Sequence, residues 1–194
     1  MPDIDIDFAD RQQVLDLLPH TRATIIDKKG LKSHNTGVYF TTAPTMPNEN
    51  QCSLDYKVAE ELGYFKLDLL NVSVYSEVTS REHLQQLIDT EPPWHKLQDQ
   101  NFVDKLFHLN GHFNVVSKLE PESIEQIACC LAIIRPAKRY LVDCGWEQIE
   151  KEVWQKPTDG QYYFKKAHAM SYAMAVVVHM NLLNFADELD CSTS

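Results

Sequence analysis

The chain has 194 residues, 44% of them apolar and 24% charged, and a chain of this size buries about 70% of its unfolded surface in an ordinary globular core. Its formal net charge of −10 argues against a freestanding, nonspecific nucleic-acid binder, whose surface would be basic. The five cysteines form no C-x-x-C pair, which argues against a zinc site and predicts reduced thiols in a cytoplasmic protein.

In chain order, the first feature is residues 2–8, in which acidic and apolar side chains alternate strictly. Period two predicts a strand with Asp3, Asp5 and Asp7 on one face and apolar residues on the other. Carboxylates two residues apart on a strand lie about 6.5–7 Å apart, so they repel one another and favour a bound cation. Mg²⁺ (or Mn²⁺) is the candidate because it prefers hard oxygen ligands. The alternative is an acidic edge strand that deters pairing with other chains.

After this strand, residues 9–18 predict a short amphipathic helix that buries four apolar side chains: Val14, Leu15, Leu17 and Leu18. Two strands are expected next, at 21–27 and 36–42.

A second short strand is predicted over residues 64–70, with Lys66 and Asp68 on one face. If it lies beside the first strand, Asp68 completes a carboxylate triad with Asp5 and Asp7, and Lys66 points a cation toward it. Three carboxylates and a lysine are what two-metal phosphoryl transfer requires.

Helices are predicted through the rest of the chain. One is capped at Thr79 or Ser80, a second covers residues 101–111 and ends at Gly111, and a third begins after Ser123 and stops at Pro136. Cys129 and Cys130 fall inside the third helix and are expected to pack in the core. Residues 167–186 are about as long as a membrane span, but polar side chains interrupt them, which favours a buried helix and no membrane.

Six segments, in one order, resemble the palm of the C-family replicative polymerases, the catalytic alpha subunit of bacterial DNA polymerase III. Residues 2–8 resemble the family's P-D-x-D-x-D-F strand, and residues 65–70 resemble its K-F-D-F-L-G-L strand. The other four segments are 34–39 (T-H-A-G-G-V in the family), 119–128 (K-P-x-S-F-E-D-L-I-A), 135–137 (R-P-G-P) and 164–173 (F-N-K-S-H-A-A-A-Y-A). The resemblance therefore covers most of residues 2–185.

The resemblance implies DNA-directed nucleotidyl transfer in DNA replication, at the nucleoid or replication site of the cytoplasm. A primer 3′-hydroxyl would attack a dNTP and pyrophosphate would leave, so primed DNA and dNTP would be partners. The implied catalytic residues, which would hold two Mg²⁺ (or Mn²⁺) ions with Asp3 as a further candidate ligand, are Asp5, Asp7 and Asp68. The implied substrate-binding residues are Lys66, Arg135, Lys165, Lys166 and His168.

The resemblance also implies the fold: α+β, with a small mixed sheet of polymerase palm type that carries the aspartates and is packed with helices. One palm-like domain with reduced fingers is expected over residues 1–186, helical from about residue 95, followed by a polar tail at 187–194.

The sequence departs from the family in ways that leave three interpretations open. The family's glycine- and serine-rich G-R-G-S-G-A-G-S segment, which holds the triphosphate, precedes the aspartate strand, whereas here only Met1 precedes Pro2. The chain could be a minimal polymerase. It could be half of a split polymerase, with another protein supplying the cradle and an apolar patch exposed near Ile4, Ile6 and Phe8. It could also be a catalytically inactive palm-like module that binds or mimics a replication protein.

Overall fold

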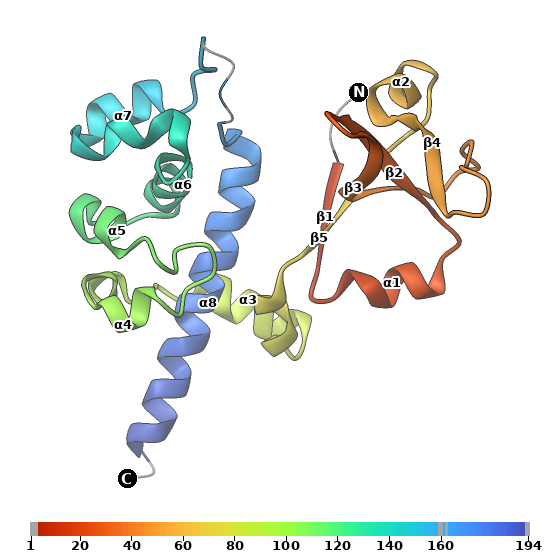
Figure 1. The fold of residues 1–194 in the computed structure, drawn as a ribbon. Helices are drawn as coiled ribbons and strands as arrows, with labels where there is room; N and C mark the ends of the chain where they lie inside the picture. Colours follow the sequence, from red (N-terminus) through yellow and green to blue (C-terminus); the bar gives the residue numbers. More distant parts are fainter. Residues whose placement is uncertain (1–3, 159–160, 162, 193–194) are drawn as a thin grey trace. The chain divides into compact units, whose positions relative to one another are not determined.

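The computed structural model describes residues 4–158, 161 and 163–192. Its contacts divide the chain into two compact units, Met1–Ser76 and Glu77–Ser194, called unit 1 and unit 2 below (Figure 1). The sequence indicated no boundary at this point, and the single domain expected over residues 1–186 spans it. Asp3 lies outside the described residues.

Unit 1 is built on a five-stranded mixed sheet with the strand order β1-β5-β3-β2-β4 (Figure 1). The outer pairs, β1 with β5 and β2 with β4, are parallel, and the two inner pairs are antiparallel. The chain is therefore α+β, as expected. The elements of unit 1 are β1 (Ile4–Phe8), α1 (Arg11–Leu17), β2 (Thr21–Asp27), β3 (Gly30–Tyr39), β4 (Gln51–Asp55), α2 (Tyr56–Glu61), β5 (Leu67–Asn71) and the 3₁₀ helix η1 (Ser73–Glu77).

The two faces of this sheet pack against different helices. Successive side chains of a strand point to opposite faces of the sheet. Val38 and Tyr39, at the end of β3, are therefore on different faces. Val38 packs with Leu15 of α1 and Leu69 of β5, whereas Tyr39 packs with Ala59 of α2. The sheet thus has an α1 face and an α2 face.

Three predictions for unit 1 need correction. The strand expected at 64–70 begins only at Leu67, so Lys66 precedes β5. Of the four apolar side chains expected to be buried by the first helix, only Leu15 is buried, whereas Leu17 is 79% and Leu18 is 48% exposed. The helix has seven residues, and Leu17 and Leu18 are its last residue and its C-cap, at the exposed end. The strand expected at 36–42 begins earlier, at Gly30, because Gly30 and Leu31 pair directly back onto β2. The strand expected at 21–27 is confirmed.

Unit 2 contains helices joined by turns and, among its described residues, no strand. From the boundary it contains α3 (Arg81–Asp89), the 3₁₀ helix η2 (Trp94–Gln98), α4 (Gln100–Val103), α5 (Phe113–Leu119), α6 (Ile124–Ile133), the 3₁₀ helix η3 (Pro136–Asp143), α7 (Trp146–Glu152) and α8 (Lys166–Ser192). The predicted cap of α3 is confirmed at Ser80, whose hydroxyl accepts a hydrogen bond from the His83 N–H. The predicted start of α6 is also confirmed, and the Ser123 hydroxyl accepts the Gln126 N–H there.

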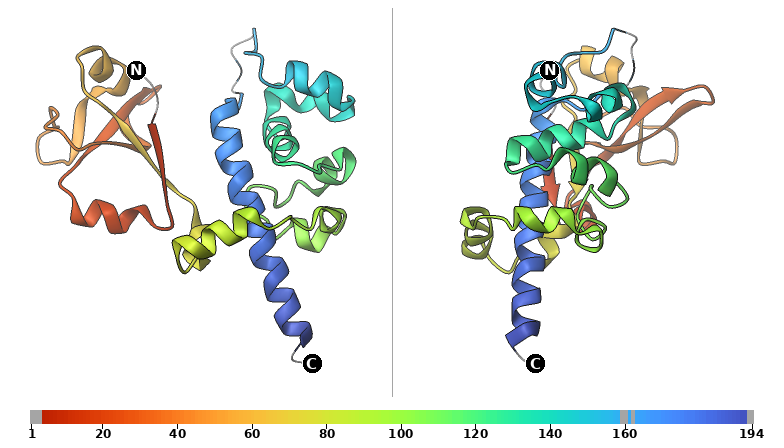
Figure 2. Two further views of the ribbon diagram at one scale, coloured as in Figure 1. Left: turned by 180° about the vertical axis from the view of Figure 1, so that it is seen from behind. Right: turned by 90° about the vertical axis from the view of Figure 1, so that its left-hand side faces the viewer.

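Helix α8 packs against α6 and α3 in the core of unit 2 (Figure 2). Ala169, Ala173, Val176 and Met180 recur at helical spacing and are fully buried in this core. By length and composition α8 could cross a membrane, but core helices of soluble proteins pass the same test. Cys129 and Cys130 of α6 are buried in the same core, as predicted.

Two helix ends in unit 2 differ from the sequence prediction. The helix expected over residues 101–111 stops at Val103. Beyond Val103 the chain continues as turns with local backbone bonds, such as that from the Leu106 N–H to Val103. The N–H of Gly111 donates to Asp104 (3.2 Å), and that of Phe107 donates to His179 Nδ1 (3.1 Å) instead of to its own helix. The polar tail expected from residue 187 instead continues α8 to Ser192, and Asp187 forms an ion pair with Lys96 at 2.8 Å.

Candidate functional site

The parallel pairing of β1 with β5 brings the predicted aspartates together. Asp5 lies directly opposite Asp68 in the register, and Asp7 lies two residues further along β1. Paired residues of neighbouring strands point to the same face, so all three carboxylates project from the α2 face of the sheet. The strand that carries Asp68 therefore lies beside the first strand, which the sequence alone left as an open condition.

Asp68 is engaged by neighbouring side chains on both carboxylate oxygens. The Lys66 ammonium contacts Oδ2, and the Thr36 hydroxyl donates to Oδ1 at 2.7 Å. His34 Nδ1 lies 3.6 Å from Oδ1. The side chains of Lys66 and Asp68 are each only 12% exposed, so this ion pair is largely shielded from water.

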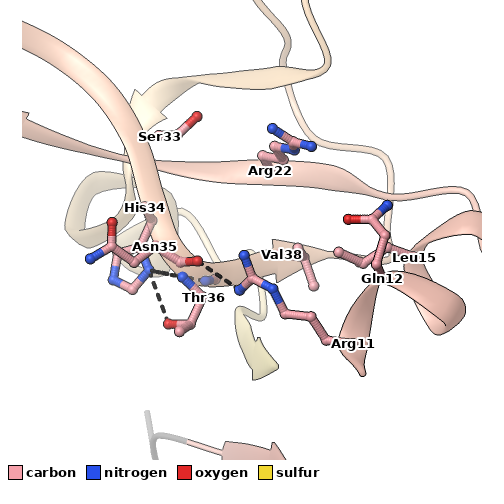
Figure 3. A pocket seen from close by; sticks show the side chains of 10 residues that line it. Arg11, Gln12, Leu15, Arg22, Ser33, His34, Asn35, Thr36 and Val38 are labelled. Carbon is pink, nitrogen blue, oxygen red and sulfur yellow. Dashed lines mark hydrogen bonds between the residues drawn. The ribbon is translucent and has the colours of Figure 1, made fainter. Parts of the chain in front are cut away.

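A bulge in β3 supplies two of these neighbours. Between the paired positions Arg22↔Val38 and Thr24↔Ser33, β2 contributes only Ala23, whereas β3 contributes residues 34–37. His34 organises this bulge, because its Nδ1 accepts the N–H of Gly37 at 3.0 Å and that of Thr36 at 3.3 Å (Figure 3).

Gly37 is enclosed tightly within the bulge. A Cβ at this position would lie 2.8 Å from Lys66 Cδ and 3.0 Å from both Ala23 Cβ and His34 Nδ1. The bare glycine backbone therefore lets Lys66 cross the bulge to reach Asp68. Tyr56 completes the surroundings, with its ring centroid 5.8 Å from Lys66 Nζ and 5.4 Å from the His34 ring.

On the β1 side, Asp7 acts on Tyr75 of η1. Burial raises the pKa of the Tyr75 hydroxyl, and the negative charge of Asp7 raises it further. Within the part of the chain that the structure describes, no group of three or more His, Cys, Asp or Glu side chains is arranged to hold a metal ion. The carboxylates share a face, but their present arrangement is held by protein contacts.

The other implied substrate-binding residues lie in unit 2, where two of the resembling segments meet. The Arg135 guanidinium lies 5.3 Å from the centroid of the Phe164 ring, which stacks on the ring of His168 at 6.3 Å. Arg135 Nε is buried and has no hydrogen-bond partner among the described residues. Lys165 and Lys166 are exposed at the start of α8. The predicted residues thus form one group in each unit.

Several neighbours of the carboxylates were missed by the sequence analysis. His34 and Thr36 lie in a segment that was quoted for its resemblance, but no role was assigned to them. Tyr56 and Tyr75 carried no signal at all. Their approach depends on the bulge and on strand order, and neither is visible in local periodicity.

No family model, no curated protein and no solved structure matches this chain. The geometry of the site and the sequence motifs therefore carry the functional proposal.

Proposed function

We propose that this chain is a palm-like nucleotidyltransferase module that extends DNA primers in a metal-dependent reaction, as its resemblance to the C-family polymerases implies. The observation that carries the proposal is the register of β1 and β5, which sets Asp5 beside Asp68 and leaves Asp7 on the same face. Asp5 and Asp68 are more than 60 residues apart in the chain, so it is the strand pairing that brings them together, and this supports the triad.

The donor set fits Mg²⁺ or Mn²⁺ in its chemistry, because all three groups supply hard oxygen ligands. When bound, the metal ions would neutralise charge on the phosphates and on the attacking and leaving oxygens. Since Lys66 contacts Asp68 Oδ2, metal binding at this oxygen requires Lys66 to move away. The released ammonium would then be free to bind the triphosphate.

Different residues of the chain would have different roles in primer extension. Asp5, Asp7 and Asp68 would orient the reacting groups, while the primer 3′-oxygen bonds to the α-phosphorus of the dNTP and the bond to the bridging oxygen of pyrophosphate breaks. Lys66 would hold the leaving phosphates. In unit 2, the nucleotide or template would contact the implied residues Arg135, Lys165, Lys166 and His168.

The edge of the sheet supports a protein partner. β1 is one of the two edge strands of the sheet in the described residues, and Ile4 and Ile6 on it are 39% and 37% exposed. Phe8, by contrast, packs against Leu15 and Leu69. An exposed apolar edge agrees with the split-polymerase interpretation, in which another protein continues the sheet and supplies the phosphate cradle.

A second candidate is the catalytically inactive palm-like module. The observation that favours it is the occupation of both Asp68 oxygens by Lys66 and Thr36. In this case the aspartate cluster stabilises unit 1, and the function is binding to a replication protein.

Primer extension tests the proposal. Wild type, Asp7→Asn and Asp68→Asn are incubated with primed DNA and dNTPs in Mg²⁺ or Mn²⁺, beside the surface control Asp89→Asn. We expect extension by wild type and by the control, and none by the two site variants.

Metal binding separates the two candidates. We expect Mn²⁺ to raise the melting temperature of wild type and of Asp89→Asn, and to leave those of Asp7→Asn and Asp68→Asn unchanged. Equal shifts in all four proteins, with no extension by any of them, would exclude the metal-dependent function and leave the inactive module.

A further inference from the structure

We propose that a cavity on the α1 face of the sheet binds a phosphate group, at a site separate from the carboxylates. The cavity has a volume of about 250 Å³ and lies between α1, β2 and the bulged part of β3 (Figure 3). Its polar lining comes from two arginines, Arg11 and Arg22, from Gln12, and from residues 33–36 of β3.

The charge of the lining is unusual for this protein. The whole chain carries a net charge of −10, yet two arginines line the cavity, and no Asp or Glu is among the described residues that line it. A guanidinium presents its donors in a planar fork that matches the oxygens of a phosphate. Two such groups beside amide and hydroxyl side chains form a site for a compact anion with several acceptor oxygens.

The two arginines differ in how they are held. Arg11 Nη1 donates to the carbonyl oxygens of Asn35 (2.6 Å) and Leu69 (3.2 Å), so its guanidinium is fixed against the bulge. In the described part of the chain, no hydrogen bond or ion pair engages the Arg22 guanidinium. Arg11 is therefore a preorganised wall of the cavity, and Arg22 is an exposed cation with its donors available.

The position of Arg22 separates this cavity from the carboxylates. Arg22 pairs with Val38, which packs on α1, so both side chains lie on the α1 face. Asp5, Asp7 and Asp68 project from the other face. The two sites lie on opposite faces but share the β3 bulge, because His34 and Thr36 both line the cavity and approach Asp68.

The volume limits the ligand to a phosphate and little more. Pockets for whole drug-sized ligands measure about 300–1,000 Å³, so this cavity accepts a phosphate with part of a sugar. Leu15 and Val38 provide an apolar wall for the carbon atoms of such a sugar. The phosphate could belong to a small monoester or to a nucleic-acid strand, and the two sources differ in the rest of the molecule.

Titration calorimetry at low ionic strength tests the site with three probes: inorganic phosphate, ribose 5-phosphate and a short single-stranded oligonucleotide. The test variant is Arg22→Gln, which breaks no bond within the described residues. Arg81→Gln is the matched control, because it removes the same charge from an exposed position in unit 2. Arg11 is left unchanged because it bonds two backbone carbonyls.

We expect saturable binding of at least one probe to wild type, with affinity lowered at least tenfold in Arg22→Gln and unchanged in Arg81→Gln. Preference for ribose 5-phosphate identifies a small monoester, and preference for the oligonucleotide identifies a strand. The proposal is overturned if none of the probes binds saturably, or if Arg22→Gln binds every probe within twofold of wild type while retaining the wild-type circular dichroism spectrum.

Discussion

Protein groups surround Asp68 and hold its carboxylate in place. Lys66 supplies the opposite charge, and Thr36 and His34 approach from a bulge about 30 residues earlier in the chain. Ion pairs of low exposure lose solvation when they form, so their contribution depends on such additional hydrogen bonds. The enclosed backbone of Gly37 makes this arrangement possible.

Gly37→Ala should therefore disturb the carboxylate site through sterics alone. The added methyl group would meet Lys66 and Ala23 at 3.0 Å or less, so we expect unit 1 to lose about 1–3 kcal/mol of stability and Lys66 to shift from Asp68. Hydrogen exchange of the β3 and β5 amides measures the loss. Gly145→Ala is the control, since a Cβ there meets no atom within 4 Å. Wild-type protection in Gly37→Ala would contradict the packing described here.

His179 gives unit 2 a defined pH dependence. Its Nδ1 accepts the Phe107 N–H, and burial lowers the pKa of its ring below the ordinary value of 6.5. The unfolded chain then binds more protons than the folded one, so the stability is fully present above about pH 6.5 and is lost as the pH falls below it. Burial lowers the pKa values of His108 and His112 in the same direction.

The variant His179→Asn should weaken this dependence, because an amide oxygen can accept the Phe107 N–H without titrating. We expect the free energy of unfolding to fall less steeply between about pH 7 and pH 5 than in wild type. Urea denaturation across this range measures the slope. His95→Asn, at an exposed position of the same unit, should keep the wild-type slope; an equal slope in all three proteins would refute the role of His179.

At the scale of elements, α8 is joined to α3 by a buried amide. Asn181 Nδ2 donates to the carbonyl oxygens of Leu87 (2.8 Å) and Thr90 (2.9 Å), which lie at the C-terminal end of α3. Carbonyl groups at a helix end have no partner within the helix. One side chain of α8 thus satisfies the end of another helix and fixes the contact between them.

Asn181→Leu should break this connection and leave a buried carbonyl and a partly buried carbonyl without a donor. We expect unit 2 to lose about 1–3 kcal/mol of stability. All three tryptophans (Trp94, Trp146 and Trp154) lie in unit 2, so urea denaturation followed by tryptophan fluorescence measures the loss. Asn184→Ala, one turn later, should stay within about 0.5 kcal/mol of wild type. Equal stability of the two variants would contradict a structural role for Asn181.

At the scale of the whole molecule, each unit has its own hydrophobic core. Leu15, Val38 and Leu69 are buried together in unit 1, and a larger core formed by α6, α8 and their neighbours fills unit 2. The predicted metal ligands all belong to unit 1, whereas most of the implied nucleotide contacts belong to unit 2. Each unit therefore carries one group of the residues that the proposal uses.

Separate cores predict separate unfolding transitions. Leu69→Ala should destabilise unit 1 by about 2–5 kcal/mol and leave the tryptophan-detected transition unchanged, whereas Ile133→Ala should shift that transition. Hydrogen exchange of the β-strand amides should give the reverse pattern. If Leu69→Ala moved the tryptophan transition as far as Ile133→Ala does, the two units would unfold as one.

Several features could be predicted from the sequence because neighbouring residues encode them. The alternation of residues 4–8 predicts β1, and the bounds of β2 agree with its β-branched run. Ser80 and Ser123 predict the starts of α3 and α6, since a capping hydroxyl acts within three residues. The apolar composition of residues 167–186 predicts the buried helix.

Only the tertiary structure decided which of these elements meet. The register that sets Asp5 beside Asp68, the bulge that brings Thr36 to Asp68, and the cavity between Arg11 and Arg22 join segments separated along the chain. The helix expected over residues 101–111 failed for the same reason, because His179 takes a backbone N–H that the helix would have used. Local patterns determine which faces are apolar, whereas packing of distant segments determines which faces and polar groups come together.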